Sequence, residues 1–537
     1  NDIIRDTGDF TADTLMVTVT EDDNVLSIAR FGTTDDLVIA FDNGTSVTIE
    51  DQFVSDSAVE KLTFRFIDPV WGNETDTFTW TGTATNGQDL LVSTNQGISV
   101  KNALGGDDIV AGGSANDTLT GGAGYDEIFG NAGADVLYGD VFNNGAITPV
   151  NGVDYDDDLY GGFGNDKLYG QVGNDWLNGF AGSDLLNGGN SWDTADYFNS
   201  PSGITVTLTN GSGTASDGFG STDTLVNIES VHGSAFDDRL TFGAGNTSNL
   251  NFTGGRGNDI ITGSTNNCGE IVKYDDDPAR VLVNLRTSAY SGNGVTIAAS
   301  TGKDGWGTTD RLTQIDGVSG SQFNDVLVGG NGAFLRGGKG NDIIVGTGNA
   351  TVGFWEGTQG ARVNIGSTDY VIGGATLVAG KGIDEFGTTD TLSGIGNISG
   401  SYDNDILIGS ATSNSIQGNS GNDTIDGGAG VDDLRGDGGN DVFRFRYANQ
   451  GGDTIADFTH GVDKIQLVSA NFGFAVAALP TNKLLDSGDP IPSSACLIYN
   501  QSNGTLSYHS AAGATSVLAH LTGNPTLTTS DFVIVAN

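Results

Sequence analysis

The chain has few basic residues, few cysteines and no long apolar run, and each shortage excludes a class of protein. Only 22 lysines and arginines stand against 68 aspartates and glutamates in 537 residues, a formal net charge of −46. Such a chain repels nucleic acid, which is therefore excluded as a partner. The two cysteines, Cys268 and Cys496, lie far apart in the sequence, which favours free thiols over a disulfide framework. Because no run of 18 apolar residues occurs, we expect no transmembrane segment.

Glycine and aspartate are abundant, and they are arranged in a nine-residue unit that recurs between Asp107 and Asp441. Two adjoining copies are Gly121–Phe129 and Gly130–Tyr138, and the shared pattern is G-G-x-G-x-D-x-U-x, where U is apolar. Glycines permit a tight turn, and the x-U-x triplet is a short strand with one apolar side chain pointing inward. Two units make one coil of 18 residues, so turns 18 residues apart stack on the same edge.

The stacking brings aspartates together in pairs. Asp423, for example, is 18 residues from both Asp405 and Asp441. Carboxylates placed side by side repel one another, and a hard cation with six or more oxygen ligands removes the conflict. Irregular sites of carboxylates and carbonyls suit Ca²⁺ better than Mg²⁺. A flexible glycine-aspartate tract without metal is the alternative, but it does not require an apolar residue two positions after each aspartate.

This unit resembles the calcium-binding nonapeptide repeat of the RTX, or haemolysin-type, family. The resemblance implies an all-β fold, in which calcium-bound parallel β-roll (solenoid) blocks alternate with β-rich spacers. It also implies that several Ca²⁺ ions are the cofactors and that folding depends on them. The candidate ligands are the aspartates of the repeats: Asp107, Asp117, Asp126, Asp135, Asp157, Asp166, Asp175, Asp184, Asp238, Asp259, Asp325, Asp342, Asp405, Asp423, Asp432 and Asp441.

The first hundred residues have the alternating pattern of antiparallel β-structure. Leu37–Phe41 and Val47–Ile49 flank Asn43-Gly44, a strong hairpin turn, and Val59–Phe66 is another expected strand. The segment resembles the β-hairpin regions that often accompany RTX repeats, and an unrelated β-sandwich is the alternative.

A longer unit occurs three times after the first repeat block. It opens with an aromatic residue, continues nine positions later with V-x-[LI], and closes with D-x-L-x-x-I-x-x-[VI]-x-G-S. The copies open at Tyr197, Tyr274 and Phe354, and their closing motifs begin at Asp223, Asp310 and Asp390. Apolar residues spaced by about three and broken by glycine and serine suit a solenoid coil better than an independent globule. We therefore expect β-rich spacers between the calcium turns.

The last hundred residues resemble the C-terminal region of serralysin-type metalloproteases and other type I secretion substrates. The resemblance lies in Asp453–Phe458, Gly461–Ile465 and Leu527–Val535, whereas His509 departs from it, since such tails usually carry aspartate there. It implies a β cap with an export signal, and type I secretion machinery as a partner. The predicted segments are an N-terminal β domain (1–100), a β-roll block (101–191), three spacers with their repeats (192–265, 266–349 and 350–445) and the C-terminal cap (446–537).

No catalytic motif is found. None of the four histidines stands in an H-E-x-x-H motif, and no G-x-S-x-G occurs. Paired carboxylates cannot identify a glycosidase here, because calcium ligation accounts for nearly all of them. Trp192, Trp306 and Trp355 lie in or beside the spacers, where we expect packing, with sugar stacking as the alternative. The chain itself is therefore not expected to be an enzyme.

Two classes of function fit these observations. The first is a secreted structural protein of the surface-layer, matrix or adhesin type, which self-assembles at the cell exterior and has cell-surface polysaccharide as a candidate partner. The second is the secretion and folding module of a larger secreted enzyme, such as a protease, lipase or polysaccharide-modifying enzyme. The chain begins at Asn1 without a methionine, which is compatible with a catalytic domain upstream. Three repeated spacers exceed what an export module needs, so the first class is favoured.

Overall fold

The computed structural model describes residues 100–140, 155–243, 246, 249–265, 269–355, 359–372 and 374–536, together with the backbone of strands β1 to β8 upstream. The chain divides into two compact units, residues 1–270 and 271–537, and each is described by itself. The regular secondary structure of the described residues is almost entirely β-strand, as predicted. No helix among them is long and apolar enough to cross a membrane.

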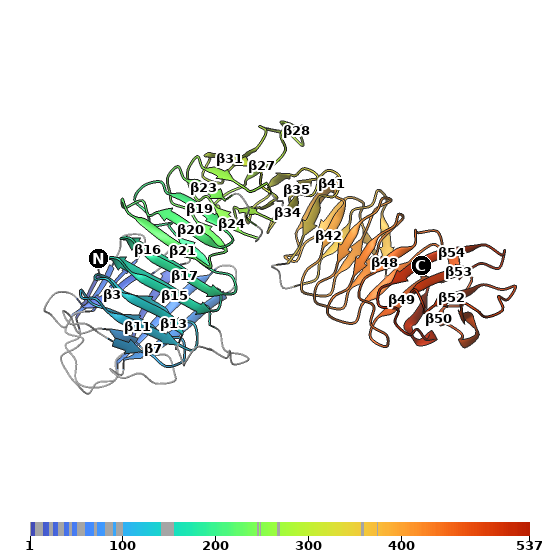
Figure 1. Ribbon diagram of the computed structural model, residues 1–537, viewed down its shortest axis with the longest axis horizontal. Helices are drawn as coiled ribbons and strands as arrows, with labels where there is room; N and C mark the ends of the chain where they lie inside the picture. The colour runs from blue at the N-terminus through green and yellow to red at the C-terminus, as the bar shows by residue number, and fades with distance from the viewer. Residues whose placement is uncertain are drawn as a thin grey trace. The chain divides into compact units, whose positions relative to one another are not determined.

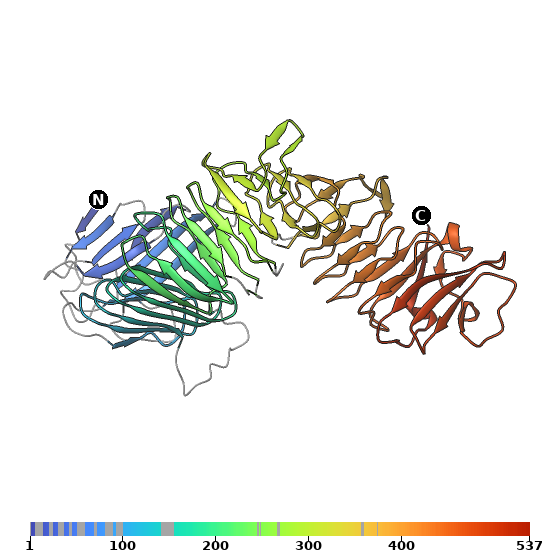
Figure 2. The ribbon, with the colours of Figure 1, turned by 45° about the horizontal axis from the view of Figure 1, so that its top comes forward.

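In the first unit the nonapeptides form coils in which the chain alternates between two parallel sheets (Figures 1 and 2). Successive strands of the first sheet are β8 (Leu90–Val92), β10 (Ile109–Ala111), β12 (Glu127–Phe129), β14 (Asp158–Phe163), β16 (Trp176–Ala181), β18 (Thr194–Asp196), β22 (Ser230–His232) and β24 (Asn251–Thr253). The second sheet contains β9 (Val100–Asn102), β11 (Thr118–Gly122), β13 (Val136–Asp140), β15 (Lys167–Val172), β17 (Leu185–Asn190), β23 (Arg239–Phe242) and β25 (Ile260–Thr262).

The apolar residue of each x-U-x triplet points into the space between the two sheets. In the second sheet, Leu119 pairs with Leu137, Leu137 with Leu168, and Leu168 with Leu186. All four are fully buried, and burying a leucine side chain contributes about 1.5–3 kcal/mol. The core of the roll is thus a column of aliphatic side chains, one from each coil, and it keeps the coils in register.

The first spacer is built into the second sheet. Its strands β19 (Thr205–Thr209), β20 (Ser212–Ser216) and β21 (Thr222–Val226) form an antiparallel meander. The meander is continuous with the repeats, because β21 pairs in parallel with β17 and β19 pairs in parallel with β23. The spacer therefore widens the roll and does not interrupt it.

The N-terminal strands form two small sheets of mixed direction. The expected hairpin is present, since β4 (Leu37–Phe41) and β5 (Ser46–Glu50) pair antiparallel; Asn43 and Gly44 lie outside the described residues. The antiparallel pattern also holds between β3 (Val25–Arg30) and β4, and between β6 (Glu60–Asp68) and β7 (Gly72–Trp80). In contrast, β1 (Asp2–Arg5) pairs in parallel with β5, and β2 (Thr14–Thr20) pairs in parallel with β6. These parallel pairs join strands distant in sequence, which local alternation does not reveal.

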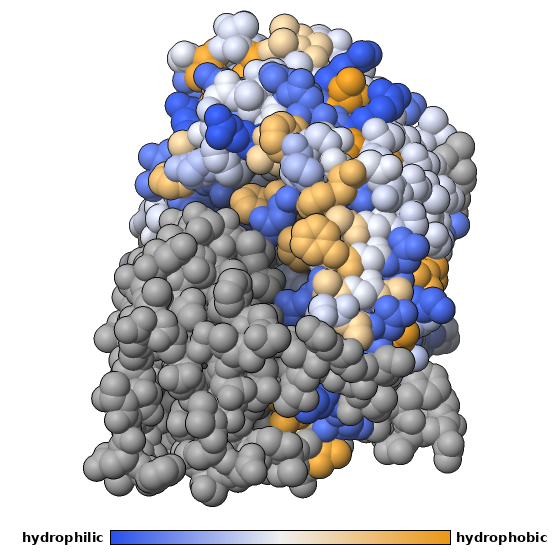
Figure 3. Space-filling model, turned by 90° about the vertical axis from the view of Figure 1, so that its left-hand side faces the viewer, coloured by the Kyte–Doolittle hydropathy of each residue, from blue (hydrophilic) through white to orange (hydrophobic). Residues whose placement is uncertain are grey.

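Side chains of different hydropathy are mixed on the face of the molecule seen in Figure 3. Hydrophilic and pale, near-neutral side chains cover most of the coloured surface, and apolar side chains gather near the middle of the view. Several large apolar side chains of this unit are exposed, among them Leu104, Tyr125, Phe163, Phe198, Phe219 and Phe236.

The second unit repeats this plan. Its first sheet consists of β26 (Ile271–Lys273), β32 (Gly317–Ser319), β34 (Phe334–Arg336), β36 (Thr351–Gly353), β42 (Asn397–Ser399), β44 (Ser415–Gln417), β46 (Asp433–Arg435) and β48 (Asp453–Ile455). The repeat strands of its second sheet are β33 (Val326–Val328), β35 (Ile343–Val345), β43 (Ile406–Ile408), β45 (Thr424–Asp426), β47 (Val442–Phe445) and β49 (Lys464–Val468).

The second and third spacers share a more elaborate plan than the first. Their antiparallel meanders are β27 (Leu282–Asn284), β30 (Thr301–Lys303) and β31 (Thr309–Thr313), and β37 (Arg362–Asn364), β40 (Lys381–Ile383) and β41 (Thr389–Ser393). Each carries an additional hairpin, formed by β28 (Tyr290–Gly292) and β29 (Val295–Ile297) in one and by β38 (Tyr370–Ile372) and β39 (Ala375–Leu377) in the other.

The C-terminal region closes the end of the roll. Strands β52 (Cys496–Asn500), β53 (Thr505–His509) and β54 (Thr515–Leu521) are antiparallel to one another, and β54 adds to the first sheet beside β48. Strand β55 (Phe532–Val535) adds to the second sheet beside β49. Smaller elements are α1 (Ser469–Phe472), β50 (Ala477–Ala478) and β51 (Leu484–Asp486). Both sheets therefore end on the tail.

Candidate metal centre

Aspartates of successive coils form ladders in which each carboxylate accepts a hydrogen bond from the backbone of the coil before it. The backbone N–H of Asp117 donates to Asp135 Oδ1 at 2.7 Å, and that of Asp135 donates to Asp166 Oδ1 at 2.7 Å. The first step spans 18 residues, as the repeat length predicts. The second spans 31, because the insertion near residues 140–153 adds chain without disturbing the ladder.

Two ladders lie on opposite edges of the first unit, one before the strands of each sheet. They consist of Asp108, Asp126, Asp157, Asp175 and Asp193, and of Asp117, Asp135, Asp166, Asp184 and Asp223. The ladders of the second unit join Asp325, Asp342 and Asp390; Asp405, Asp423, Asp441 and Asp463; and Asn414, Asp432 and Asp453.

In many of these residues the second carboxylate oxygen is buried and accepts no hydrogen bond. They are Asp126, Asp135, Asp157, Asp166, Asp175, Asp184, Asp193, Asp342, Asp423 and Asp432. A buried ionised oxygen without a donor or a cation is costly, by several kilocalories per mole. A cation placed next to these oxygens would therefore stabilise the folded chain more than a cation elsewhere on the roll.

The unpaired oxygens face the first glycine of their own turn. A Cβ atom placed on Gly130 would lie 2.7 Å from Asp135 Oδ2 and 2.4 Å from the carbonyl oxygen of Gly161, one coil further on. Gly418 has the same surroundings, since its Cβ would lie 2.1 Å from Asp423 Oδ2 and 2.8 Å from the Gly436 oxygen. A carboxylate oxygen and a carbonyl oxygen thus approach each of these glycines so closely that no Cβ atom fits, and only glycine lets the two oxygens come together there.

Burial raises the pKa of these carboxyl groups, and neighbouring carboxylates raise it further in several of them. Desolvation raises the pKa of Asp423 to about 8, with contributions from Asp405 and Asp441. The pKa of Asp135 is raised to about 7 and that of Asp342 to about 10, again mainly by burial. Without a cation beside them, these carboxyl groups therefore hold a proton more readily than an exposed aspartate does.

This donor set fits calcium. Ca²⁺ prefers hard oxygen ligands, accepts irregular geometry and is satisfied by a mixture of carboxylate and carbonyl oxygens. Among the described residues, no three side chains of histidine, cysteine, aspartate or glutamate converge on one point. A cation in the turns would be held by carboxylates of the ladder together with main-chain carbonyls. When bound, a divalent cation would neutralise the buried carboxylates; the chain's own residues supply the oxygens and hold them in register.

The predicted ligands fall into three groups. Nine of them carry the buried unpaired oxygen: Asp126, Asp135, Asp157, Asp166, Asp175, Asp184, Asp342, Asp423 and Asp432. Asp259 and Asp441 are also buried ladder residues. In the remaining residues the structure gives the carboxylate another environment: these are Asp107, Asp117, Asp238, Asp325 and Asp405.

Serine replaces the second glycine of the turn in three of that last group. Ser234 donates its backbone N–H to Asp238 Oδ2 at 2.7 Å and its hydroxyl to Oδ1 at 2.7 Å. Ser321 bonds Asp325, and Ser401 bonds Asp405, in the same way. The G-S that closes each spacer motif thus supplies donors to the next carboxylate. Asp117 differs, because its Oδ2 accepts a bond from the Gly113 backbone at 2.7 Å.

Asp107, one of the predicted calcium ligands, lies outside the buried ladders. Asp107 is exposed and accepts the backbone N–H of Tyr125 at 3.0 Å, whereas Asp108 is buried and bonds Asp126. The position before the ladder aspartate carries a second, outer ladder of this kind. Asn116, Asn165 and Asn404 accept backbone N–H groups 18 residues further along the chain, with distances of 2.6–2.9 Å.

The sequence reasoning also missed ladder residues outside complete nonapeptides. Asp193, Asp223, Asp390, Asp453 and Asp463 each continue a ladder. Asp223 and Asp390 are the first residues of the spacer closing motif, D-x-L. This motif has the same D-x-U order as the repeat, so the order could have predicted that Asp223 and Asp390 belong to a ladder.

The aromatic residue that opens a spacer bonds the same aspartate. The hydroxyl of Tyr197 donates to Asp223 Oδ2 at 3.0 Å, and that of Tyr274 donates to Asp310 Oδ2 at 2.9 Å. The third copy has Phe354, which carries no hydroxyl, opposite Asp390. In the first and second copies the two ends of the spacer motif therefore meet in space.

A buried carboxylate, Asp531, links the last strand of the tail to the turn that contains His460 and Gly461. Asp531 is fully buried and lies 2.9 Å from His460 Nδ1, and it accepts backbone bonds from Thr528 and Gly461. Although burial pushes the pKa of Asp531 up, these donors hold it below its usual value.

Cys496 is a buried free cysteine, and burial raises the pKa of its thiol; Cys268 lies outside the described residues. Trp355 stacks on Phe334 with ring centroids 4.6 Å apart, as expected for packing.

The coils, the ladders and the glycine-lined oxygen sites define a metal-binding parallel β-roll. A family profile described as the RTX calcium-binding nonapeptide repeat matches residues 102–119, 111–145, 151–186, 172–196, 251–267, 319–350 and 408–443. The chain therefore contains RTX calcium-binding nonapeptide repeats, in several copies along its length.

Comparison with whole proteins finds only a weak similarity. No curated protein matches the sequence. Among solved structures, the chain is similar to the extracellular lipase LipA from Serratia marcescens, with 13% identity and a TM-score of 0.13. That similarity covers 83% of this chain and 41% of the lipase chain, so this chain spans less than half the length of the lipase.

Proposed function

We propose that the protein is an extracellular structural protein, of the surface-layer, matrix or adhesin type, which folds and assembles when it binds Ca²⁺ outside the cell. The observation that carries this proposal is the ladder of buried carboxylates with unpaired oxygens. Without cations these carboxyl groups must either bind protons or stay buried without a partner charge when the roll forms, so calcium becomes part of the folding free energy.

The affinity expected of such sites supports an extracellular setting. Calcium sites of extracellular modules have dissociation constants of roughly 10⁻⁴–10⁻³ M, so they fill only where calcium is abundant. A chain of net charge −46 with 85 glycines stays unfolded without the ion. The C-terminal cap, which resembles that of type I secretion substrates, supports export by that machinery in an unfolded state.

Assembly is supported by what the roll leaves on its surface. Acidic side chains such as Asp107 are exposed, and calcium shared between two copies would remove the repulsion that otherwise separates such acidic chains. Large apolar side chains are exposed as well, including Phe163 at 71% and Tyr402 at 63%. Cell-surface polysaccharide is a further candidate partner, and we propose no catalytic activity for the chain.

The test has two parts. Circular dichroism in excess chelator, followed by added calcium, measures folding, and we expect β-structure to appear only with calcium. Electron microscopy and light scattering then measure assembly, and we expect ordered sheets or filaments with calcium that disperse on chelation. An unchanged β spectrum in chelator would overturn the calcium dependence.

The alternative is that the chain is the secretion and folding module of a larger secreted enzyme. The resemblance of its tail to that of serralysin-type proteases favours this reading. It predicts calcium-dependent folding without assembly, so a strictly monomeric particle at millimolar calcium would select it. Hydrolase activity of the intact natural protein, lost when residues upstream of Asn1 are removed, would select it too.

A further inference from the structure

The second and third spacers are built alike, and one substitution between them opens a cavity. Asn284 and Asn364 end the equivalent strands β27 and β37. Asn284 donates to the Ile297 carbonyl at 3.3 Å, and Asn364 donates to the Leu377 carbonyl at 2.9 Å. Each asparagine thereby holds its additional hairpin, β28–β29 or β38–β39, against the roll.

Two residues after the asparagine, the second spacer has Arg286, and its guanidinium lies against the main chain of the next coils. Its Nε donates to the Gly329 carbonyl at 2.9 Å. Its Nη2 donates to the carbonyls of Val345 and Gly346 at 3.2 and 3.0 Å. Three main-chain acceptors thus form a receptor for a guanidinium group within the chain.

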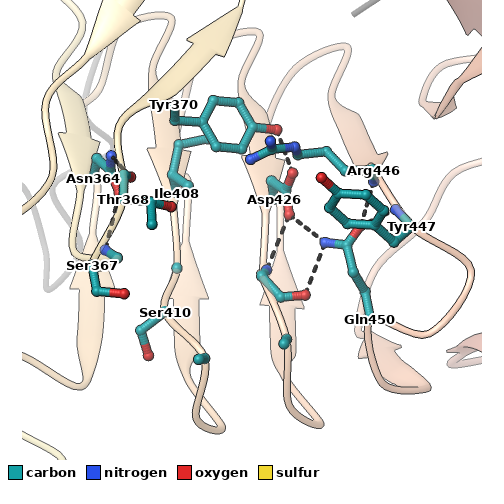
Figure 4. Close-up of a pocket in the computed structure, with 15 residues that line it drawn as sticks. Asn364, Ser367, Thr368, Tyr370, Ile408, Ser410, Asp426, Arg446, Tyr447 and Gln450 are labelled. Carbon is teal, nitrogen blue, oxygen red and sulfur yellow. Dashed lines mark hydrogen bonds between the residues drawn. The ribbon is translucent and has the colours of Figure 1, made fainter. Parts of the chain in front are cut away.

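The third spacer has Gly366 at the corresponding position, so no side chain extends over the coils from there. A cavity of about 180 Å³ lies beside Gly366, Gly409 and Asp426 (Figure 4). Gly409 follows Ile408 as Gly329 follows Val328. Asp426 pairs with Ile408 as Val345 pairs with Val328. The cavity therefore lies where the second spacer places its arginine.

The walls of this cavity are fixed by their own contacts, as Figure 4 shows. The hydroxyl of Tyr370 donates to Asp426, and Gln450 Nε2 donates to Asp426 Oδ1 at 2.8 Å. The Arg446 guanidinium lies 4.4 Å from the centre of the Tyr370 ring. Since these groups hold one another in place, a ligand finds a preformed site.

The size and charge of the site limit its ligand. About 180 Å³ is less than the roughly 300–1,000 Å³ of sites for drug-sized molecules, so one small group fits and an oligosaccharide does not. Asp426 brings a carboxylate where the second spacer has the apolar Val345. Its carboxylate is already hydrogen-bonded to Tyr370 and Gln450. The guanidinium groups of Arg444 and Arg446 lie 5.8 and 4.4 Å from the centre of the Tyr370 ring, so recognition of a ligand falls to the main-chain carbonyl oxygens.

We propose that the cavity of the third spacer binds a guanidinium group, either of an arginine side chain or of a small guanidine, in the place that Arg286 fills in the second spacer. A guanidinium presents five N–H donors in a fixed plane and reaches carbonyl acceptors that are spread apart, as Arg286 does, whereas an ammonium has its three donors on a single nitrogen. The proposal stands on the comparison of the two spacers and does not depend on calcium-driven assembly.

The test uses agmatine as the probe and putrescine, which has an ammonium in place of the guanidinium, as its control. Calorimetry on the calcium-folded chain should give one agmatine site, with putrescine about tenfold weaker or more. Gly366→Arg places an arginine in the cavity and should remove that site. Arg286→Gly opens the second spacer and should add one. Circular dichroism and the melting temperature in calcium confirm that each variant is folded.

The variants also decide against the proposal if it is wrong. No agmatine binding by the wild-type chain, or equal binding by wild type and Gly366→Arg, overturns it. So does putrescine binding as tight as agmatine. A simple sugar that binds in competition with agmatine and as tightly would equally overturn it.

The source of the guanidinium is found by a second measurement at constant calcium. If a second copy of this chain supplies the arginine, Gly366→Arg and saturating agmatine should each reduce self-association in sedimentation. If another partner or a free guanidine supplies it, self-association stays unchanged while agmatine binding is still lost in Gly366→Arg. Both outcomes support the shared chemistry.

Discussion

Replacing Gly418 with alanine tests the oxygen site between two coils directly. The new methyl group would lie 2.1 Å from Asp423 Oδ2 and 2.8 Å from the Gly436 oxygen, so it would displace the carboxylate oxygen that we expect to bind the cation. Gly438→Ala is the matched control, because its methyl would meet nothing closer than 3.9 Å. Neither glycine has a positive φ, so the backbone accepts alanine equally at both positions.

The magnitude follows from binding linkage. At calcium concentrations about 100-fold above the dissociation constant, one site stabilises the folded state by about 2.7 kcal/mol. For a unit of some 270 residues the loss of that site lowers the melting temperature by roughly 5–10 °C. We expect Gly418→Ala to show this loss in saturating calcium and Gly438→Ala to melt within a degree or two of wild type.

Scanning calorimetry and circular dichroism in calcium and in chelator make the assay complete. In chelator the two variants should give the same spectrum. Equal melting temperatures of the two variants in saturating calcium would refute the placement of the cation beside the first glycine. A loss that is as large in chelator as in calcium would show that the methyl group disturbs packing and not ion binding.

Three further outcomes are expected. Asp432→Asn should weaken calcium-saturated stability by about 2–3 kcal/mol, whereas Asp433→Asn, an exposed neighbour with the same loss of charge, should change it by less than about 0.5 kcal/mol in calcium titrations. Asp531→Asn should destabilise the C-terminal cap at neutral pH in thermal melts. The folded pKa of Asp531 is below its unfolded value, so the charged carboxylate stabilises the cap above about pH 4 and this stabilisation is lost as the pH falls further. The difference in stability between wild type and Asp531→Asn should follow the same course. A difference that is constant at every pH would contradict the role of the charge. Tyr197→Phe should lower the free energy of unfolding by about 0.5–1.5 kcal/mol, as expected for the loss of one hydrogen bond to Asp223. An unchanged melting temperature would show that this bond does not contribute to stability.

The repeats made the coil predictable. Their D-x-U order places one apolar residue inside each strand, and the leucine columns of the core follow that order without exception in β11, β13, β15 and β17. The same order failed at Asp107 and Asp108. Both residues have an apolar residue two positions later, Ile109 and Val110, so the pattern fits either register, and burial decides for Asp108.

The chemistry of individual sites was less predictable, because it depends on residues that come together only in space. Asp238 has the sequence of a calcium ligand, yet Ser234 supplies it with two donors. The serine in place of the second glycine is visible in the sequence, but its meaning depends on the turn geometry. The cavity beside Gly366 is further from prediction, since it becomes visible only when the pairing partners of Ile408 and Val328 are known.

The direction of the hydrogen bonds along the ladders gives the roll a polarity. Each coil donates its backbone N–H to the carboxylate of the coil that follows it in the chain, as Asp405 does to Asp423 and Asp423 to Asp441. The oxygen site of a coil is likewise completed by a glycine carbonyl from the following coil, as at Gly418 and Gly436. Each coil therefore relies on the coil that follows it for a carboxylate and a carbonyl oxygen. The last repeat coil relies on the C-terminal region in the same way, since the backbone N–H of Asp441 donates to Asp463 Oδ1 at 3.0 Å. Shortening the chain from the C-terminus would remove that partner first.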